Sequence, residues 1–448
     1  MGSTNLASLI EFSRDGEWGI NNPQVGYFEM AVIRGTDFDS IREGRTDSVP
    51  TRYIKEHIVE NKKLYGGEIL LETAGGSKGR ITGRSIYLKP ETIARFKKPV
   101  TCASFSRFIR LKNIESINKN YVFWLLQYLY HFGSMNKYHT QHTGVSRFQW
   151  TIFAENEMFD LPYIKTQKKI AATLSAYDDL IENNLRRIKI LEEMAQNLYR
   201  EWFVNFRFPG HENARFVDSP LGKIPERWEP VPVKDFLSKN IGGSWGKEEI
   251  SGDYQSKVRV IRGTDFSRIK VGTFDTIPTR YIKPKELNNR MLEAGDLLIE
   301  NSVNASSRCV GTPQIITQGI LKRLGDPTIC ASFCKLYRPK TDKYTVFLYL
   351  HMNYLLEENK MNFYQNVAAN GIGNFQSQRF LQDEMIIVPS KGAEFDKLLS
   401  SIKPLLTSLY AEKTDILRQT RDLLLPKLIS GEVDVSELDI KMPVEVAI

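Results

Sequence analysis

The sequence has few cysteines and no long apolar segment, and each of these absences excludes a class of protein. Only 4 cysteines occur among 448 residues, too few for a disulfide-stabilised extracellular fold. The longest apolar stretch, at 121–130, is shorter than the roughly 20 residues of a transmembrane helix. The first residues include Glu11 and no small-residue cleavage site, unlike a secretory signal. We therefore expect a cytoplasmic protein that does not associate with a membrane.

Sequence motifs of the common nucleotide-using enzymes are missing as well. Neither Gly222-Lys223 nor Gly246-Lys247 has the preceding glycine and following Ser or Thr of a phosphate-binding loop. The dinucleotide-binding pattern Gly-x-Gly-x-x-Gly is also absent. The nearest match to the amino-methylation turn Asn/Asp-Pro-Pro-aromatic is NNPQ at 21–24, which lacks the second proline and the aromatic residue. The sequence therefore predicts that the chain is not itself an enzyme.

Glu-x-Lys strings occur at 60–62 and 358–360, with Asp47 and Asp342 upstream, as in metal-dependent nucleases. Neither string follows a buried strand, and 25% of the residues are charged, so chance matches are expected. We therefore do not predict nuclease activity.

Half of a zinc ligand set occurs twice, as a histidine pair and as a cysteine pair. Neither pair has an equivalent in the other half of the chain. The pairs are His139 with His142 and Cys330 with Cys334. Surface histidines and core cysteines are the simpler interpretation, so no metal site is predicted.

The composition is that of a folded, moderately basic protein. Hydrophobic residues make up 41% and aromatic residues 11%, enough for about three domains with their own cores. The formal net charge is +8, which favours an acidic partner. Nucleic acid is the first candidate.

An internal repeat organises the chain. Residues 32–55 and 260–283 are identical at 16 of 24 positions, at an offset of 228 residues. The same offset places the CASF segment at 102–105 on an identical segment at 330–333. Such a long period indicates a duplicated domain rather than a solenoid, so two similar ligands are expected. Each copy carries a net charge of +4 and mixes short strands and helices, which predicts an α+β fold.

A long amphipathic helix is predicted after each copy. Residues 166–203 contain no Pro or Gly, and apolar residues alternate four and three apart. A matching helix is predicted from about Glu394 to Leu425, ended or kinked by Pro426. The two apolar stripes would pack as an antiparallel, coiled-coil-like pair. Asn184 on the first stripe either sets the register of the pair or is simply tolerated there.

These patterns divide the chain into six segments. They are a first domain at 1–160, a first long helix at 161–205, a linker at 206–227, a second domain at 228–389, a second long helix at 390–430 and a C-terminal tail at 431–448.

The candidate DNA-binding residues are basic and amide side chains on glycine-rich turns, which suit phosphate and base-edge contacts. Some recur at matched positions, and others lie on loops that differ between the copies. Residues shared by both copies could instead pair with Asp37 and Asp265 or with Glu72 and Glu300, and identical residues do not distinguish two sequences. The candidates are Arg34, Arg52, Lys78, Arg80, Arg84, Arg147, Arg262, Arg280, Asn301, Asn304, Ser306 and Arg308.

These features together resemble a known family. The duplicated domain with IRGTDF and CASF, the segment DLPYIKTQKKIAATLSAYDDLIENN and the linker DSPLGKIPERWE are similar to the specificity subunit of type I restriction-modification enzymes. The resemblance implies two target recognition domains, each reading one half of a split double-stranded DNA site, with the long helices setting the gap. The second copy departs from the pattern, since it has Phe395-Asp396 where a glutamine is expected after Pro389.

The resemblance also implies partners. Two methyltransferase subunits would dock on the helices, and ATP-dependent restriction subunits would join the complex. S-adenosylmethionine, ATP and Mg would be bound by those partners, with no cofactor on this chain. The expected docking residues are Gln167, Leu180, Leu185 and Ile190. The alternatives are a self-contained restriction or methylation enzyme, the specificity subunit of a related type II system, or a two-domain scaffold without a DNA role.

Overall fold

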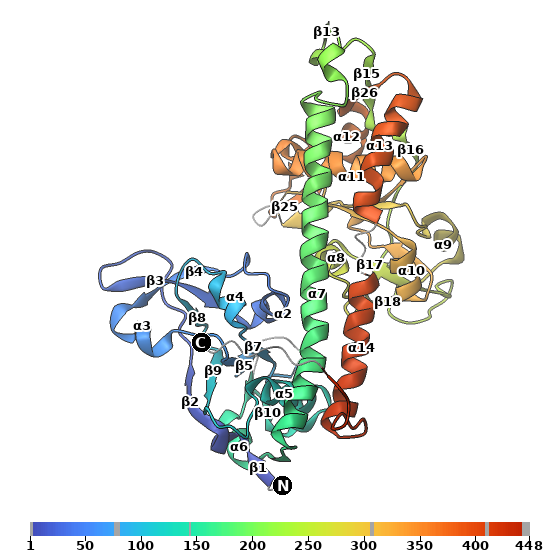
Figure 1. The fold of residues 1–448 in the computed structure, drawn as a ribbon. Helices are drawn as coiled ribbons and strands as arrows, with labels where there is room; N and C mark the ends of the chain where they lie inside the picture. Colours follow the sequence, from blue (N-terminus) through green and yellow to red (C-terminus); the bar gives the residue numbers. More distant parts are fainter. Residues whose placement is uncertain (1–2, 76–80, 143–144, 305–308, 408–411, 441–448) are drawn as a thin grey trace. The chain divides into compact units, whose positions relative to one another are not determined.

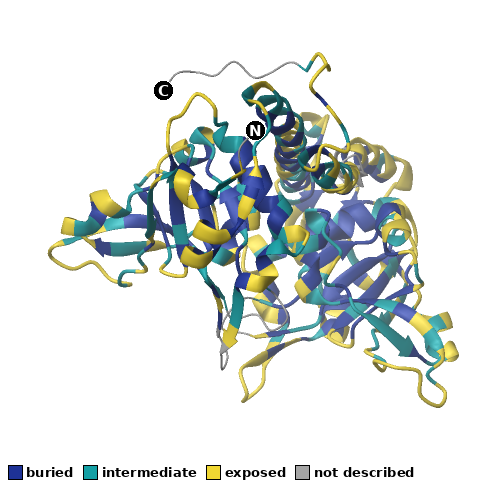
Figure 2. Ribbon diagram, turned by 90° about the horizontal axis from the view of Figure 1, so that it is seen from below, coloured by how far each residue is buried: buried dark blue, intermediate teal, exposed yellow. Residues whose placement is uncertain are grey.

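The computed structural model describes residues 3–75, 81–142, 145–304, 309–407 and 412–440. The chain forms two compact units, one of residues 1–183 with 416–448 and the other of residues 184–415. Each unit contains one copy of the repeat, and within each unit the buried residues, dark blue in Figure 2, lie on the sheets and the helices that cover them. The α+β class predicted from the sequence is confirmed.

The first unit is built on a four-stranded antiparallel sheet in the order β2-β9-β5-β7. Its central strand β5 is fully buried, as its apolar run predicted, and Leu70 pairs with Phe108 on one side and Ile86 on the other. A bulge between Ile10 and Phe12 interrupts the edge pairing, a feature that bends and twists a strand. The strands are β2 (Ile10–Asp15), β5 (Ile69–Glu72), β7 (Ser85–Tyr87) and β9 (Ser106–Leu111).

Three smaller sheets complete this unit. The sheet β4-β3-β8 combines an antiparallel and a parallel pair, β10-β11-β6 is a hairpin with one short added strand, and β1 pairs with β12. The strands are β1 (Ser3–Asn5), β3 (Tyr27–Ile33), β4 (Thr51–Lys55), β6 (Ala74–Gly75), β8 (Val100–Cys102), β10 (His139–His142), β11 (Val145–Phe148) and β12 (Met158–Asp160).

The helices of the first copy are short except for α5, whose apolar run at 121–130 is almost entirely buried in the main core. Asn118 caps this helix by accepting a hydrogen bond from the Tyr121 amide. The helices are α1 (Leu6–Leu9), α2 (Phe38–Arg42), α3 (Glu56–Lys62), α4 (Pro90–Ala94), α5 (Lys119–His131) and α6 (Trp150–Asn156).

The second unit repeats this plan strand for strand. Its sheets are ordered β16-β23-β19-β21, β18-β17-β22, β20-β25-β24 and β15-β26, with an added hairpin β13-β14. Even the bulge recurs, between Leu237 and Lys239. The strands are β13 (Phe216–Ser219), β14 (Gly222–Pro225), β15 (Trp228–Pro232), β16 (Leu237–Gly242), β17 (Ser256–Ile261), β18 (Thr279–Ile282), β19 (Leu297–Glu300), β20 (Ser302–Asn304), β21 (Pro313–Ile315), β22 (Thr328–Cys330), β23 (Cys334–Pro339), β24 (Gln365–Val367), β25 (Ile372–Phe375) and β26 (Met385–Pro389).

The helices of this copy also correspond to those of the first. Here α11 takes the part of α5 and is buried along most of its length in the main core. The helices are α8 (Phe266–Lys270), α9 (Pro284–Arg290), α10 (Gln318–Leu324), α11 (Asp342–Glu357) and α12 (Ser377–Asp383).

The long helix predicted after the first copy is present. The helix α7 (Ile164–Tyr199, green in Figure 1) continues into a π-helical turn at Arg200–Val204, two residues earlier at its start than predicted. The residues of the predicted stripe are buried or half-buried from Ile170 to Trp202. Asn184 is half-buried on that stripe.

The second long helix differs from its prediction. Two helical segments are described, α13 (Gly392–Thr407) and α14 (Glu412–Ile429). Pro426 does not end α14, which continues to Ile429. The predicted stripe holds at Leu398 and Ile402 but is wrong at Ile416 and Leu423, which are 60% and 67% exposed. The predicted stripe continues the helical phase of α13, whereas the buried residues of α14, among them Leu425 and Leu428, follow a different phase.

Candidate nucleic-acid interface

Arg34 and Arg262 form the same local clamp in the two copies. Each guanidinium donates two hydrogen bonds to one aspartate, Asp37 or Asp265, at 2.8–3.0 Å. Each also donates to a main-chain carbonyl 14 residues downstream, at Ser48 or at Thr276. The hydrogen bond to Asp37 or Asp265, together with its negative charge, raises the pKa of each arginine. Arg34 and Arg262 thus pair with Asp37 and Asp265, which was the structural alternative to DNA contact. The clamp fixes the turn that follows β3 in the first copy and β17 in the second.

Arg84 is also a framework residue. Its guanidinium donates to both carboxylate oxygens of Glu72 at 2.9 and 3.0 Å, and to the Gly35 carbonyl at 2.8 Å. Only 12% of the side chain is exposed, so its expected role in reading DNA is corrected to one in holding β5 against the turn at Gly35. The sequence offered Glu72 as a partner for Arg52, but the buried position of Arg84 gives it that carboxylate instead.

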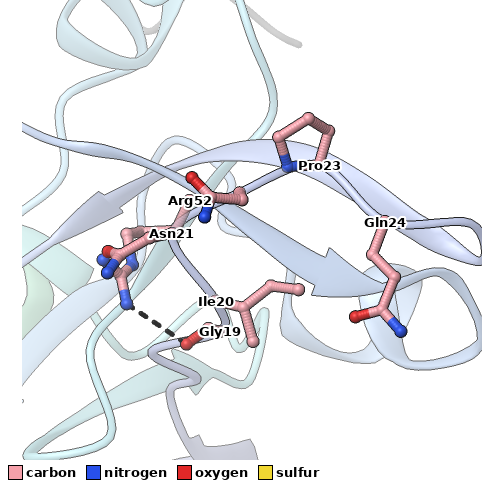
Figure 3. Close-up of a pocket in the computed structure, with 7 residues that line it drawn as sticks. Gly19, Ile20, Asn21, Pro23, Gln24 and Arg52 are labelled. Carbon is pink, nitrogen blue, oxygen red and sulfur yellow. Dashed lines mark hydrogen bonds between the residues drawn. The ribbon is translucent and has the colours of Figure 1, made fainter.

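Arg52 lies over the ring of Trp18, with 4.3 Å between guanidinium carbon and ring centroid. It donates to the carbonyls of Trp18 and Gly19 and lines an open cavity of about 630 Å³ formed with residues 19–24 (Figure 3). Gly19 has a φ of +66°, and a Cβ there would lie 2.3 Å from the Tyr53 carbonyl oxygen. The close approach therefore requires glycine at this position.

Arg280 repeats this arrangement with a different polar partner. It lies 4.6 Å from the ring centroid of Trp245 and forms a 3.0 Å ion pair with Glu248. Gly246 has a φ of +68° and approaches the Tyr281 carbonyl as Gly19 approaches that of Tyr53. The tryptophans were missed in the sequence, although an offset of 227 relates Trp18 to Trp245 and carries the signal.

The two copies differ in chemistry on one pair of matching sheets, β10-β11-β6 and β20-β25-β24, called here the small sheets. In the first copy Arg147 on β11 is exposed and lies opposite Ala74. In the second, Asn374 takes the place of Arg147 and lies opposite Ser302, whose hydroxyl donates to the Asn374 side chain at 2.8 Å. Arg and Asn are the side chains that recognise guanine and adenine edges. One position on a common backbone thus presents two different groups.

The remaining candidates on these sheets lie on or beside the glycine-rich loops. Asn304 is exposed on β20. Asn301 is held through its main chain by Phe333 and Phe375, while its side-chain amide donates to the Ser302 hydroxyl at 3.4 Å. Lys78, Arg80, Ser306 and Arg308 lie outside the described residues.

The predicted partner-docking residues divide into two groups. Leu180 and Ile190 are 49% and 48% exposed on α7, as expected. Leu185 is only 7% exposed, because it falls on the buried side of the helix, so its assignment was wrong. Met194, at 47% exposure, extends the exposed set one turn beyond Ile190 and was missed.

Gln167 was also wrongly assigned to partner docking. Its side chain is 1% exposed and fully engaged inside the first unit. The amide oxygen accepts from the Asn118 amide, and the amide nitrogen donates to the carbonyls of Ser116 and Pro162. These bonds tie the start of α7 to the N-cap of α5, so the glutamine is structural.

A buried charge cluster anchors the first copy to the helices of its own unit. Asp178 on α7 pairs with Arg42 on α2 at 2.8 Å and with Arg421 on α14 at 2.5 Å. Burial by itself would raise the pKa of Asp178, but the two arginines outweigh it and the pKa is lowered. In the second unit Lys270 occupies the position of Arg42 and contacts Tyr349, which donates to Glu192 on α7.

The second Glu-x-Lys string is far from its upstream aspartate. Asp342 and Glu358 lie at opposite ends of α11, about 24 Å apart along its axis. Across the part of the chain that the structure describes, no group of three or more His, Cys, Asp or Glu side chains could hold a metal ion. Cys102, Cys330 and Cys334 are buried core residues and Cys309 is half-buried. No described helix is both long and apolar enough to span a membrane.

Comparison with known proteins first gives the class of this geometry. Residues 53–193 match the model of the type I restriction modification DNA specificity domain. This segment, which spans part of the first copy and most of α7, is therefore similar to that DNA specificity domain.

Individual relatives carry the same description. The type I restriction enzyme MjaIX specificity subunit of Methanocaldococcus jannaschii is 26% identical over 327 residues, which is 70% of this chain and 69% of the relative. The HindI specificity subunit of Haemophilus influenzae is 25% identical over 325 residues, 61% of this chain and 68% of the relative. The S subunit structure from M. genitalium aligns over 95% of both chains, with 14% identity and a TM-score of 0.49. By the sequence matches the chain is similar to type I specificity subunits, and the resemblance seen in the sequence is confirmed.

Proposed function

We propose that the two copies are target recognition domains and that each reads one half of a bipartite double-stranded DNA site. The observation that carries this proposal is the contrast at Arg147 and Asn374. A common framework presents different polar groups at one position of the small sheet. A protein that reads two different half-sites needs a shared scaffold with exchanged contact residues.

Arg52 and Arg280 fit a shared role at the DNA backbone better than a role in base choice. Both are identical in the two copies and are held in place by a tryptophan ring and neighbouring groups. A fixed cation suits a phosphate, which is the same at every half-site. Arg34 and Arg262 are 39% and 35% exposed, but each forms a neutral pair with its aspartate, so their role is to hold the turn rather than to contact DNA.

The experiment for this function is the mapping of methylated bases in cells that carry the chain with the methyltransferase and restriction genes of its own locus. A split motif of two short sequences separated by an unread gap is expected. A contiguous motif would contradict the proposal and favour the specificity subunit of a different system. Methylation by this chain without the methyltransferase would favour the alternative of a self-contained enzyme.

We further propose that the exposed residues of α7 dock two methyltransferase subunits, with restriction subunits joining through them in the cytoplasm. Leu180 lies in the first unit and Ile190 and Met194 in the second, which gives one apolar group of α7 to each. Exposed apolar residues on a charged helix are typical of protein interfaces. Changing Leu180 and Ile190 to Asp should release the methyltransferase in co-purification while both units stay folded. Undiminished binding would contradict this assignment.

The long helices would act as an antiparallel pair that sets the gap between the half-sites. Duplicating Leu185 to Ile188, with four helical residues added between α13 and α14, adds about 6 Å and about 40° beyond a full turn. One base pair adds about 3.4 Å and about 34°. The gap in the methylated motif should lengthen by one or two base pairs with both half-sites unchanged. An active protein with an unchanged gap would show that the helices do not set it.

A further inference from the structure

Each copy exposes a phenylalanine at the same place. Phe105 and Phe333 end the two CASF segments, whose cysteines are buried, and are 61% and 68% exposed. Single exposed apolar residues are common on protein surfaces, so exposure alone assigns no role to either ring; its recurrence at the same place in both copies is the informative observation. The two copies have diverged along most of their length, yet both retain this ring.

The turn that carries Phe105 is held from three sides. The Ala103 amide donates to the Ile33 carbonyl at 2.8 Å, and the amides of Thr73 and Ala74 donate to the Phe105 carbonyl at 2.9 and 3.2 Å. On the third side the strand end at Gly16 is so close that a Cβ there would lie 1.9 Å from the Cys102 carbonyl oxygen. The backbone is therefore fixed while the ring remains exposed.

The turn at Phe333 is held in the same way. The Ala331 amide donates to the Ile261 carbonyl at 2.9 Å, and the Asn301 amide donates to the Phe333 carbonyl at 2.8 Å. A Cβ at Gly243 would lie 2.1 Å from the Ala331 carbonyl oxygen. Both copies thus retain a glycine so that the strand end can pack against this turn.

A matched cation lies beside each turn. Lys62 donates to the carbonyls of Asp15 and Gly16, and Arg290 donates to the Gly242 carbonyl. Burial raises the pKa of Cys102 and of Cys330 to about 12, and the charge of Lys62 or Arg290 acts against that rise. One cation therefore lies beside each turn, next to the sheets β10-β11-β6 and β20-β25-β24 that differ between the copies.

We propose that Phe105 and Phe333 are apolar wedges that enter the base stack of DNA, one in each half-site. This inference rests on the proposed function and adds a contact that does not depend on sequence. Apolar side chains on rigid elements unstack a base step, and every base has a face on which an aromatic ring can stack. A contact needed at both half-sites should be identical in both copies, whereas contacts that choose bases should differ, as Arg147 and Asn374 do.

DNA is a better occupant of this surface than a partner protein. A cation and a single aromatic ring, rather than a broad apolar patch, match a phosphate backbone with its stacked bases. The main-chain bonds from Thr73 and Asn301 also connect each turn directly to the strands that lead into the glycine-rich loops. The ring and the base-choosing positions therefore belong to one surface.

The test uses the full chain with its methyltransferase and a duplex that carries the mapped motif. The variants are Phe105→Ala and Phe333→Ala. Phe132→Ala is the matched control, because Phe132 is 53% exposed at the end of α5, away from the turn. Since each ring is exposed, its removal should leave thermal unfolding unchanged. Phe105→Trp should bind DNA more tightly than Phe105→Ala, because it keeps an aromatic ring at this position.

Each turn variant should weaken binding about 5- to 150-fold, with an unchanged slope of log K against log salt, because no charge is lost. In duplexes with 2-aminopurine at successive positions of a half-site, the fluorescence rise on binding should disappear only for the variant of the copy that reads it. Binding and fluorescence equal to those of Phe132→Ala would overturn the proposal, as would a loss confined to methyltransferase association. If the wild-type chain yields no split motif, the proposed function itself fails, which is a distinguishable result.

Discussion

The two copies share a framework and differ at the surface that the framework presents. The clamps at Arg34 and Arg262 are matched bond for bond, including the acceptor carbonyl 14 residues downstream. On the small sheet, by contrast, Arg147 in one copy corresponds to Asn374 in the other. The comparison separates residues that must satisfy one backbone from residues that can vary with a ligand. Basic residues alone do not reveal this difference, since both groups contain arginine.

The copies also differ in how they are anchored to the helices of their own units. The first uses the buried cluster of Asp178 with Arg42 and Arg421. The second uses Lys270 with Tyr349 and Glu192, and a separate ion pair between Arg323 and Asp415. We therefore expect unequal sensitivity to the loss of a single carboxylate.

The largest effect is expected for Asp178→Asn. The change leaves Arg42 and Arg421 buried without their carboxylate and should lower the free energy of unfolding of the first unit by about 3–5 kcal/mol. The matched change Glu192→Gln, at a half-buried position of the second unit, should cost about 1 kcal/mol. Urea unfolding of the full chain measures both. Equal costs would show that the two anchors are equivalent after all.

A smaller loss of stability is expected for Arg84→Ala, by about 2–3 kcal/mol, because Glu72 loses a two-bond charged partner. Half-site choice should not change, since the side chain is only 12% exposed. Unfolding and methylation mapping together test this prediction. A changed methylated motif in a stably folded Arg84 variant would contradict this prediction and show that Arg84 contributes to reading DNA.

For Arg147→Asn we expect the opposite of the Arg84→Ala result: the folding stability should stay the same and the DNA sequence specificity should change. Arg147 is exposed, so its loss should cost less than about 0.5 kcal/mol of folding free energy. Discrimination at one base of one half-site should fall by about 1–3 kcal/mol. Competition binding with single-base variants of the mapped motif measures the difference. The exposed Lys322→Asn, on α10 of the other copy, is a control that should leave the motif intact.

The smallest effect is expected from moderate acidification. The folded pKa of Asp178 lies below its ordinary value of 3.8, so its contribution to stability is fully present above that value and is lost as the pH falls through the lower folded pKa. Between pH 7 and pH 5 this cluster should therefore contribute no change in stability. Below about pH 4 the wild type should lose stability more steeply than Asp178→Asn. Parallel slopes for the two proteins would show that Asp178 is not the titrating group.

The framework was largely predictable from the sequence, because residues that a duplicated domain needs for its fold recur at matching positions in both copies. The buried strands at 68–72 and 296–300, the helix α7 and the core cysteines follow from apolar runs, spacing and identity at the offset of 228. Phe105 and Phe333 are also identical at matching positions of the two copies. Identity alone, however, does not distinguish a buried residue from an exposed one.

The assignments that failed depend on tertiary position. Gln167 and Arg84 have polar side chains that suit a surface, yet each finds buried partners from distant segments. Leu185 lies on the buried side of α7 because the helix is covered on more than its predicted stripe. The buried face of α14 could not be predicted by continuing the stripe of α13, since Ile416 and Leu423 on that stripe are exposed while Leu425 and Leu428 are buried.

The central claim is that two equivalent domains each determine one half of the target. It is tested most directly by replacing residues 1–162 with a second copy of residues 228–389, in a chain otherwise unchanged, and mapping the methylated motif in cells with the partner genes. The prediction is a split motif whose two halves are the same sequence, namely the wild-type half-site read by the second copy. A methylated motif that keeps both wild-type half-sites would contradict it.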